Sequence, residues 1–423
     1  MRILWFSTNS SSYISGDEVC TSTYGSWMSS LQDELKKRTG INLGICFCME
    51  GQPTKVEQAG GTYYPIPAHK KTMRDKIIDL LHPTDVRRDE ILWPYYIEQF
   101  QRVIEDFRPD VIEVFGSELY MGLSAIVARD MHVPFVLHLQ GLLSLYIYIL
   151  LPPGMSRWQY IWRHRSLRRA YGNYQELLYW NRSCHREKTI LQACSDVIGR
   201  TEWDKNAFSI LNPKARYHYG GEILRPEFYE PADRNPSSVP LIVTTISRPT
   251  YKGLDLLLKV AQILKCELHL DFTWNIYGNV ESDYADRLTG IWHEDVNVHL
   301  CGVATARNLR EALLSSVLYF HPSYIENSSN SVCEAQMTEI PVVTTNVGGT
   351  SSLVEHGRTG FLFPATDPYM GAYYVKRLIE DKNLNISMGQ EAHRVAQQRH
   401  DKGKIIESLL STYANLKENG GIA

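Results

Sequence analysis

The sequence predicts an α/β protein of two domains, each a parallel β-sheet with helices on both faces. Two observations predict this class. Short apolar runs alternate with amphipathic helical patterns, and this alternation stops near residue 222 and starts again near residue 241. The chain has 423 residues, 43% of them hydrophobic, which is enough for two domain cores. We therefore expect two Rossmann-like domains.

Five apolar runs in the first half are expected to form buried strands, at residues 3–7, 43–48, 110–115, 135–138 and 197–200. Helical spacing of apolar residues predicts helices over 26–38, 92–107 and 119–130. Together these elements are expected to form a first domain over residues 1–222.

The second half is expected to carry strands at 241–246, 273–277, 296–300, 317–320 and 342–344. Residues 224–240 contain four prolines and show no periodicity, which predicts that they form a linker before these strands. The second domain is expected over 223–401, and a helical pattern follows over 402–417.

Composition excludes several classes of function. A net charge of −3 argues against a nucleic-acid binder. The eight cysteines form no CxxC pair and no cluster with histidine at zinc spacing, so we expect reduced thiols of a cytoplasmic protein without a metal site. The longest apolar run, 142–151, is about half as long as a bilayer-spanning helix. Neither GxGxxG nor a P-loop motif occurs, which argues against a dinucleotide dehydrogenase and a P-loop NTPase.

Glu326 and Glu334 have seven residues between them. On one helix this step would turn the second side chain by about 80° and move it by about 12 Å, so the carboxylates would not converge. The polar residues 327–331 are good N-caps, so a helix is expected to begin near Ser329 or Asn330. Glu326 then lies in the preceding loop and Glu334 in an early turn.

A helix start of this kind can bind an anion, because free N–H groups and the positive end of the helix dipole face it. We expect a phosphate at the amides of Asn330 and Ser331, with Glu326 and Glu334 on either side to accept hydrogen bonds from sugar hydroxyls. The alternative is a surface glutamate followed by a helix glutamate that favours the dipole.

This stretch resembles the E-x7-E signature of the retaining GT-B glycosyltransferases of family 4, the glycosyl transferases group 1. Gly348-Gly349, the turn 355–363 and Asp367-Pro368 follow in the order and spacing of that family. The resemblance is good over 240–380 and loose over the first 220 residues. It implies a GT-B fold, with two Rossmann-like domains facing each other across a cleft and the helix 402–417 crossing back to the first domain.

The resemblance also implies a reaction. The second domain would bind a nucleotide-diphosphate sugar and the first a glycan or lipid-linked acceptor. The sugar would be transferred with retention of its anomeric configuration and without a metal or other cofactor. Cell-surface polysaccharide biosynthesis, in the cytoplasm or peripherally at the inner membrane face, is the expected setting.

Arg248 and Lys252 resemble the cations with which the family binds the donor diphosphate. Two fixed cations would stabilise the charge that accumulates there as the glycosidic bond breaks. Their spacing of four is one shorter than the family's commoner form. The alternative is two solvated side chains at a strand–helix turn. In the same pattern Glu326 would bind sugar hydroxyls and Glu334 the ribose.

Three further segments match the family pattern. His138 ends a predicted strand at the edge where open α/β sheets bind ligands, and it would contact the transferred sugar; an acceptor contact or a structural histidine are the alternatives. Gly25 resembles part of the loop near the donor phosphates, or it is a helix-start glycine. Gly302 and Val303 resemble the strand end that binds the base through its backbone, which leaves uracil, guanine and adenine open.

Residues 157–188 carry eight Lys and Arg against two Glu, interleaved with seven Trp and Tyr. A helix would place Trp158, Ile161 and Trp162 on one face, continued by Arg165 and Arg169. This strip suits an anionic membrane or a lipid-diphosphate acceptor. The alternative is a helical excursion with its aromatic residues packed inward. Single-stranded nucleic acid, another partner of such segments, has no further support in the sequence.

Two other functions stay open. A sugar-nucleotide epimerase would share the fold but release no nucleotide, and the E-x7-E context speaks against it. A nucleotide-sugar-binding assembly partner without turnover is conceivable because Asn327 and Ser329 stand where many relatives have glycine.

Overall fold

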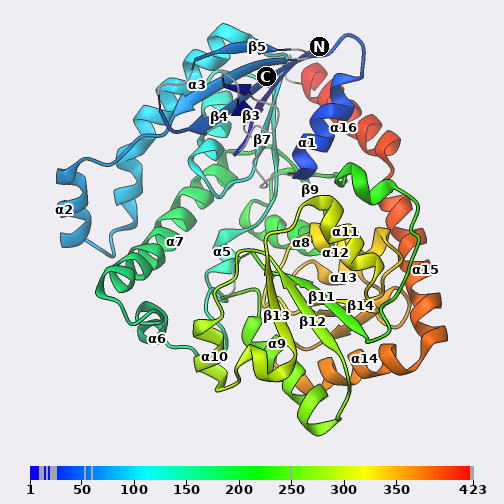
Figure 1. The fold of residues 1–423 in the computed structure, drawn as a ribbon. Coiled ribbons are helices and arrows are strands. Elements are labelled where there is room, and N and C mark those ends of the chain that lie inside the picture. Colours follow the sequence, from blue (N-terminus) through cyan, green and yellow to red (C-terminus); the bar gives the residue numbers. More distant parts are fainter. Residues whose placement is uncertain are drawn as a thin grey trace. The chain divides into compact units, whose positions relative to one another are not determined.

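The computed structural model describes residues 1–8, 14–15, 18–19, 26–51, 54–58, 61–247 and 250–419 (Figure 1). The chain divides into two compact units. Unit 1 comprises Met1–Ile147, Glu176–Ile223 and the C-terminal segment that begins at Asp401, and unit 2 comprises Tyr148–Gln175 and Leu224–His400. Each unit is built on its own largely parallel sheet, so the predicted α/β class with two Rossmann-like domains is confirmed.

The sheet of unit 1 has eight strands in the order β10-β9-β8-β7-β1-β4-β6-β5. All neighbours are parallel except β5 and β6. The strands are β1 Arg2–Phe6, β4 Asn42–Met49, β5 Val56–Gln58, β6 Gly61–Pro67, β7 Val111–Phe115, β8 Phe135–His138, β9 Asp196–Gly199 and β10 Arg216–Tyr219. A separate antiparallel pair consists of β2 Ile14–Ser15 and β3 Glu18–Val19.

The five strands predicted for this unit are present within two residues of their expected bounds. The helices are α1 Ser26–Lys36, α2 Met73–Leu81, η1 Val86–Leu92, α3 Trp93–Phe107, η2 Tyr120–Leu123, α4 Ser124–Asp130, α5 Leu143–Tyr146, α8 Glu202–Leu211 and α16 Lys402–Asn419. The long helix α7, Leu167–Ala193, begins in unit 2 and ends in unit 1. The C-terminal helix returns to the first sheet as expected, because α16 packs against α1 and β7.

The sheet of unit 2 has six parallel strands in the order β13-β12-β11-β14-β15-β16. The strands are β11 Leu241–Thr245, β12 Thr273–Tyr277, β13 Val298–Gly302, β14 Leu318–His321, β15 Val342–Thr345 and β16 Gly360–Phe363. The helical segments are α6 Arg157–Ile161, η3 Pro226–Tyr229, α9 Leu254–Gln262, the π turn η4 Ile263–Glu267, α10 Asp283–Thr289, η5 His293–Val296, α11 Ala306–Leu314, α12 Asn330–Met337, α13 Thr350–Leu353, α14 Pro368–Glu380 and α15 Lys382–Arg399.

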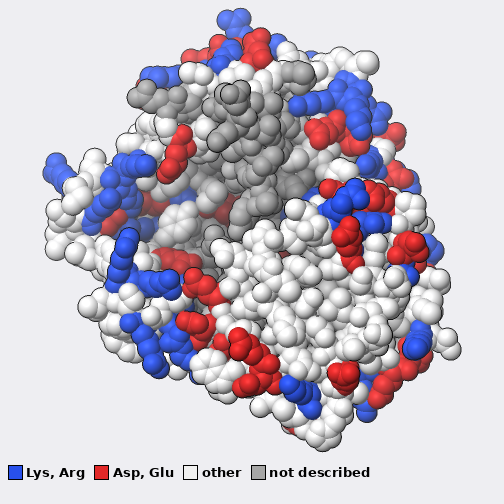
Figure 2. All heavy atoms as spheres, viewed as in Figure 1, with Lys and Arg blue, Asp and Glu red and all other residues white. Residues whose placement is uncertain are grey.

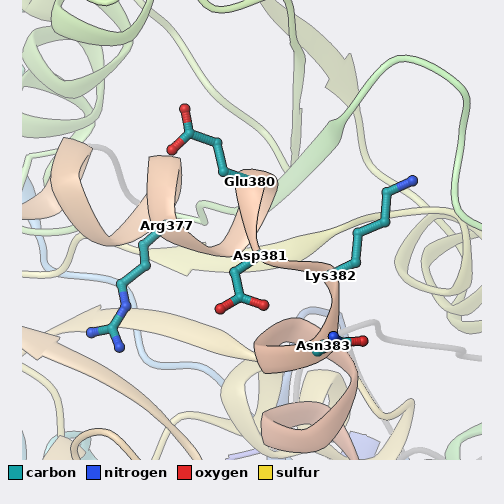
Figure 3. Close-up of a pocket in the computed structure, with 5 residues that line it drawn as sticks. All are labelled: Arg377, Glu380, Asp381, Lys382 and Asn383. Carbon is teal, nitrogen blue, oxygen red and sulfur yellow. The ribbon is translucent and has the colours of Figure 1, made fainter.

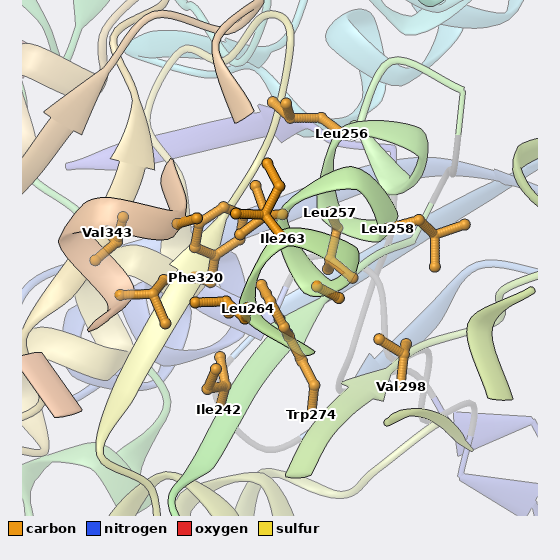
Figure 4. Packing of buried hydrophobic residues seen from close by; sticks show 14 of the residues in the cluster. Ile242, Leu256, Leu257, Leu258, Ile263, Leu264, Trp274, Val298, Phe320 and Val343 are labelled. Atoms are coloured by element: carbon orange, nitrogen blue, oxygen red, sulfur yellow. The ribbon is translucent and has the colours of Figure 1, made fainter. Parts of the chain in front are cut away.

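Both faces of this sheet are buried, which explains why its strands read as continuous apolar runs. On β14, Leu318 and Phe320 belong to one core, whereas Tyr319 belongs to the core on the opposite face. Figure 4 shows the first of these cores, where the Trp274 ring packs edge-on against Phe320 at 4.9 Å. Because successive side chains of a strand point to opposite faces of the sheet, the apolar residues of β14 pack against both layers of helices.

Two expectations about the second half need correction. Strand β13 begins at Val298, two residues later than predicted, because Asn297 adopts a left-handed φ of 59° that ends η5. The proline-rich segment is more than a linker, since Leu224 and Phe228 are fully buried in the core of unit 2.

The basic and aromatic strip 157–188 does not form one helix. Helix α6 ends at Ile161, and Arg165 has a left-handed φ of 49°, so Arg165 and Arg169 do not continue the face of Trp158. Tyr160 and Trp180 are buried, whereas Trp158 is 67% exposed. The strip therefore contains both inward-packed and exposed aromatic rings, and its first part, up to Gln175, groups with unit 2.

Candidate functional site

A buried ion pair in unit 2 joins Lys252, which follows β11, to Glu326, which follows the neighbouring strand β14. The Lys252 Nζ donates to Glu326 Oε2, and the two side chains are only 15% and 11% exposed. His321 Nε2 lies 3.2 Å from the same oxygen, and Ser323 Oγ lies 3.5 Å from it. One carboxylate oxygen thus has three partners at the carboxyl edge of the sheet, where open α/β sheets bind ligands.

The charges of this cluster are set by burial and by one another. Burial would raise the pKa of Glu326, but the Lys252 ammonium and His321 outweigh it and hold that pKa well below its usual range. Burial would lower the pKa of Lys252, yet the Glu326 charge raises it. The pKa of His321 is lowered by burial, so its ring is neutral at pH 7. The buried Nδ1 of His321 has no hydrogen-bond partner among the described residues.

Two glycines hold the loops that carry this pair. Gly253 has a φ of +73°, and a Cβ there would lie 2.0 Å from the carbonyl oxygen of Pro322. Gly348 has a φ of +50°, and a Cβ there would lie 1.9 Å from the carbonyl oxygen of Glu326. That same oxygen accepts a hydrogen bond of 2.9 Å from Gly349 N. At both glycines the backbone approaches the neighbouring carbonyl more closely than a residue with a Cβ could. This close approach holds the loops that carry Lys252 and Glu326 in place.

Helix α12 begins at Asn330, where the sequence predicts it, with Glu326 in the loop before it and Glu334 in its second turn. Ser329 is the N-cap and makes no side-chain capping bond, so the first N–H groups of the helix lack the usual side-chain acceptor. The Ser331 hydroxyl instead accepts from Tyr319 Oη at 2.7 Å. The buried Oδ1 of Asn330 has no hydrogen-bond partner in the part of the chain that the structure describes. Within that part, this helix end offers N–H donors and one acceptor without a partner.

Glu334 forms a two-pronged ion pair with Arg225. The Nε and Nη2 of Arg225 donate to the two carboxylate oxygens at 2.7 and 2.8 Å. Burial would lower the pKa of Arg225, but Glu334 raises it, so the guanidinium stays charged. Each glutamate of the E-x7-E pair is thus held by a cationic side chain in this structure.

Gly302 and Val303 lie at the carboxyl end of β13, which is an edge strand of the sheet. Gly302 has a φ of +71° with open space around it, and its carbonyl accepts from Gly278 N at 2.8 Å. Val303 is 67% exposed. Both residues are exposed at this end of the strand.

His138 lies in unit 1, at the end of β8, and is buried between aromatic rings. Its Nδ1 is 2.8 Å from Glu113 Oε1, and its ring stacks on Phe115 at 5.4 Å and lies 5.1 Å from the Trp27 ring. The other oxygen of Glu113 accepts from Tyr413 Oη, on α16. The buried His138 Nε2 has no partner among the described residues.

This chain of contacts favours one tautomer of His138. If Nδ1–H donates the hydrogen bond to Glu113 Oε1, the lone pair lies on Nε2. The Trp5 indole N–H donates to Tyr413 Oη at 3.1 Å and completes the series. Two expected site residues, Gly25 and Arg248, lie outside the described residues.

The described residues contain no group of three or more His, Cys, Asp or Glu side chains placed to hold a metal ion. A surface hollow occurs where α14 passes into α15 (Figure 3). Its Asp381 caps α15 by accepting from Leu384 N at 2.9 Å, and its Arg377 lies over the Phe361 ring. Asp381 thus caps a helix and Arg377 packs on an aromatic ring, so the hollow is not a candidate site.

Two family models match the chain. The model described as glycosyl transferases group 1 matches residues 230–395, and the model described as glycosyl transferase 4-like domain matches residues 45–185. The chain thus carries a domain of the glycosyl transferases group 1. The family match covers the ion pair, the start of α12 and both loop glycines of unit 2.

Curated relatives of this chain match over shorter stretches. The capsular polysaccharide biosynthesis glycosyltransferase CapM of Staphylococcus aureus is 33% identical over 105 residues, which are 25% of this chain and 28% of CapM. A D-inositol 3-phosphate glycosyltransferase of Pseudarthrobacter chlorophenolicus is 30% identical over 151 residues, 34% of this chain and 36% of the relative. The matched region thus spans about a third of these relatives or less.

Solved structures extend the likeness to the whole fold of this chain. Sucrose-phosphate synthase from Thermosynechococcus elongatus aligns over 98% of both chains with a TM-score of 0.71 and 17% identity. HepE from Anabaena, in complex with UDP and glucose, aligns over 98% of this chain and 99% of its own with a TM-score of 0.61 and 18% identity. The GT-B fold is therefore established for this chain.

Three residues of the site escaped the sequence analysis. Arg225 stands in the proline-rich segment, where a single arginine gives no signal. Tyr413 is one of several apolar positions on a helix and reads as core. Glu113 did leave a signal, because it is the only charged residue in the apolar strand β7. A charge that interrupts a strand buried on both faces needs partners, and those partners are His138 and Tyr413.

Proposed function

We propose that this protein is a glycosyltransferase that moves a sugar from a nucleotide-diphosphate donor to a glycan or lipid-linked acceptor. One observation carries the proposal: the buried ion pair of Lys252 with Glu326, which His321 at the end of β14 contacts, with Glu326 in the loop before α12, whose N-cap residue makes no side-chain capping bond. A cation, a carboxylate and free helix N–H groups are the groups that a diphosphate and a sugar hydroxyl require.

Each residue has a proposed role. Lys252, together with Arg248, binds the diphosphate, and the amides of Asn330 and Ser331 contact a phosphate oxygen. Glu326 accepts hydrogen bonds from sugar hydroxyls, Glu334 binds the ribose, and Gly302 and Val303 contact the base. His138 contacts the transferred sugar or the acceptor, and Gly25 approaches the phosphates. The contacts of Lys252 and Glu334 with other side chains mean that the donor competes with Glu326 and Arg225 respectively.

The proposed chemistry retains the anomeric configuration. The acceptor oxygen attacks the anomeric carbon on the face from which the phosphate departs, and the bond between that carbon and the phosphate oxygen breaks. The acceptor proton passes to the departing phosphate, and the nucleoside diphosphate is released. The two cations stabilise the charge on the leaving group, which we propose they do without a divalent metal. No pair of carboxylates is assigned here as acid and nucleophile.

The acceptor and setting are proposed from the relatives. CapM is named for capsular polysaccharide biosynthesis, and another relative is the phosphatidylinositol N-acetylglucosaminyltransferase gpi3 subunit of Schizosaccharomyces pombe, 27% identical over 184 residues. Both names fit a glycan or a lipid-linked acceptor. The structure of HepE with UDP makes UDP the first nucleotide to test.

Calorimetry with UDP, GDP and ADP, each with EDTA and with Mg²⁺, tests the donor half of the proposal. We expect one nucleotide to bind in EDTA and its affinity to fall at least about tenfold in Arg248→Ala, which corresponds to about 1.4 kcal/mol. Turnover of the matching nucleotide sugar then separates transferase from the alternatives. Release of nucleotide with retained configuration supports a transferase, interconversion without release an epimerase, and binding without either an assembly partner.

A further inference from the structure

Helix α2 of unit 1 exposes most of its apolar side chains. Met73 is 72% exposed, Ile77 56%, Leu80 54% and Leu81 68%. A helix of a soluble protein normally turns its apolar stripe to the core. In α2 the side chain that is buried is Asp79, at 5% exposure. The usual orientation of an amphipathic helix is therefore reversed.

Ion pairs hold α2 in this orientation. Asp79 contacts Lys71 Nζ at 2.5 Å, Arg88 Nε at 3.1 Å and Arg182 Nη1 at 3.2 Å, the last from α7. Burial would raise the pKa of Asp79, but these cations keep it below the ordinary value, so the carboxylate stays charged. Rolling the stripe inward would separate Asp79 from three cations and is therefore unfavourable.

The positions of the side chains around the helix define a narrow apolar face. At about 100° per residue, Leu80, Met73, Ile77 and Leu81 fall within an arc of about 100°, and Asp79 lies about 160° from Ile77. Lys76 borders this arc on one side and Arg74 on the other, and both are exposed. Lys70, just before the helix, is 80% exposed on its side chain. We call Met73, Ile77, Leu80 and Leu81 with Arg74 and Lys76 the α2 face.

The acidic groups near the α2 face do not cancel its positive charge. Asp75 completes a capping box with Thr72, and Glu50 lies 3.7 Å from Lys70 with both side chains exposed. In Figure 2, basic side chains lie beside uncharged ones on the left, at the place of α2 in Figure 1. An apolar stripe bordered by cations on both sides is the pattern of a helix that lies in the interface of an anionic bilayer.

We infer that the α2 face docks unit 1 on an anionic lipid surface, with its four apolar side chains among the acyl chains and its cations at the headgroups. This inference goes beyond the proposed function and does not depend on the donor. It assigns lipid contact to α2, whereas the strip 157–188 has two of its aromatic rings buried. No helix in the described part of the chain has the length and apolar content to cross a bilayer, so the contact proposed is peripheral.

Flotation of the full-length protein with vesicles tests the inference. Vesicles of phosphatidylcholine alone are compared with vesicles that contain phosphatidylglycerol, at low and high salt. We expect binding to the anionic vesicles only, weakened by salt, because screening acts on exposed charges. Ile77→Asp with Leu81→Asp should reduce the bound fraction about tenfold, and Arg74→Glu with Lys76→Glu should abolish the preference for anionic lipid.

Two controls make the test specific. Ile210→Asp changes an apolar residue that is 82% exposed on α8 of the same unit, and Trp158→Asp changes the exposed tryptophan of the strip. Both variants should float like the wild type, and all variants should keep the wild-type unfolding temperature because the changed residues are exposed. Light scattering on the same samples measures the oligomeric state.

Three results would overturn the inference. The first is no flotation of the wild type with anionic vesicles at low salt. The second is an equal loss of flotation in the α2 and Ile210 variants. The third is a dimer of the wild type that Ile77→Asp dissociates, which would make the α2 face an interface between copies. Loss of flotation in the α2 variants with unchanged nucleotide binding separates this inference from the proposed function.

Discussion

Lys252 and Glu326 each depend on the other to compensate a buried charge. Removal of one partner leaves the other charge buried and unpaired, which costs far more than the pair itself contributes. A diphosphate that binds Lys252 in place of Glu326 would leave the Glu326 charge buried and unpaired, unless sugar hydroxyls donate hydrogen bonds to it instead. This coupling would favour a complete nucleotide sugar over a bare nucleotide.

Lys252→Met should therefore have two effects. We expect the free energy of unfolding to fall by about 3 kcal/mol because Glu326 loses its cation, and the affinity for the nucleotide diphosphate to fall at least about tenfold. Adding Glu326→Gln should restore most of the stability but not the binding. Denaturant unfolding and calorimetry measure the two quantities, with Lys382→Met, an exposed lysine of unit 2, as the control. Unchanged stability in the single variant would contradict the role of the pair.

The low pKa of Glu326 predicts a pH dependence of stability. Its pKa in the folded chain lies below the ordinary value of 4.5. The ionised carboxylate therefore stabilises the fold fully above pH 4.5, and this contribution is lost as the pH falls from there toward the folded pKa. The stability advantage of the wild type over Glu326→Gln should be constant from pH 7 to 5 and shrink below pH 4.5. An advantage that grows on acidification would contradict the assignment.

At the scale of elements, α16 supplies the hydroxyl that fixes Glu113, and Glu113 in turn orients His138 at the end of β8. Strand β8 and helix α16 are far apart in sequence, so this contact could not be predicted from either segment alone. The chain of hydrogen bonds makes Tyr413 a positioning residue for whatever His138 binds.

Tyr413→Phe tests this positioning. The ring packing stays, but Glu113 loses a donor and Trp5 an acceptor, which should cost on the order of 1–3 kcal/mol in unfolding free energy. If His138 serves the reaction, the pH profile of kcat/KM should shift while nucleotide affinity is unchanged. Tyr179→Phe, an exposed tyrosine of the same unit, is the control. A loss of stability with an unchanged pH profile would leave Tyr413 a purely structural role.

Elements with strong local signals could be predicted from the sequence, and the others could not. Strand β8 and the start of α12 lie where expected because an apolar run and a polar cap mark them. Strand β10 was missed because its half-exposed residues form no apolar run, and β6 because prolines occupy its Pro65 and Pro67 positions. The contacts of Glu334 and Lys252 with side chains distant in sequence depend on tertiary packing, which spacing alone does not encode.

At the scale of the whole molecule, the two units differ in whether their fold includes the C-terminal segment. Unit 2 is complete at His400, whereas unit 1 includes α16. The buried hydrophobic residues of α16 are Ile405, Ile406, Leu409, Tyr413 and Leu416.

A variant that ends at residue 400 should therefore lose stability in unit 1 alone. Burial of a large apolar side chain contributes about 1.5–3 kcal/mol, so the loss of α16 should destabilise unit 1 by several kcal/mol. Scanning calorimetry should show one transition at a lower temperature and one unchanged, and nucleotide binding should persist. A uniform shift of both transitions would show that the units do not unfold independently.

The same arrangement sets an order in time during synthesis on the ribosome. Trp5 and Tyr413, which share a hydrogen bond, are 408 residues apart. At roughly 5–20 residues per second, roughly 20–80 s separate the addition of these two residues. The strands of the first sheet are thus synthesised early, but the helix α16 that packs on this sheet is synthesised only after every strand of the second sheet. From the addition of Glu113 to that of Tyr413, 300 residues later, a growing chain would carry the uncovered surface around Glu113, and a chaperone has reason to bind it during that time.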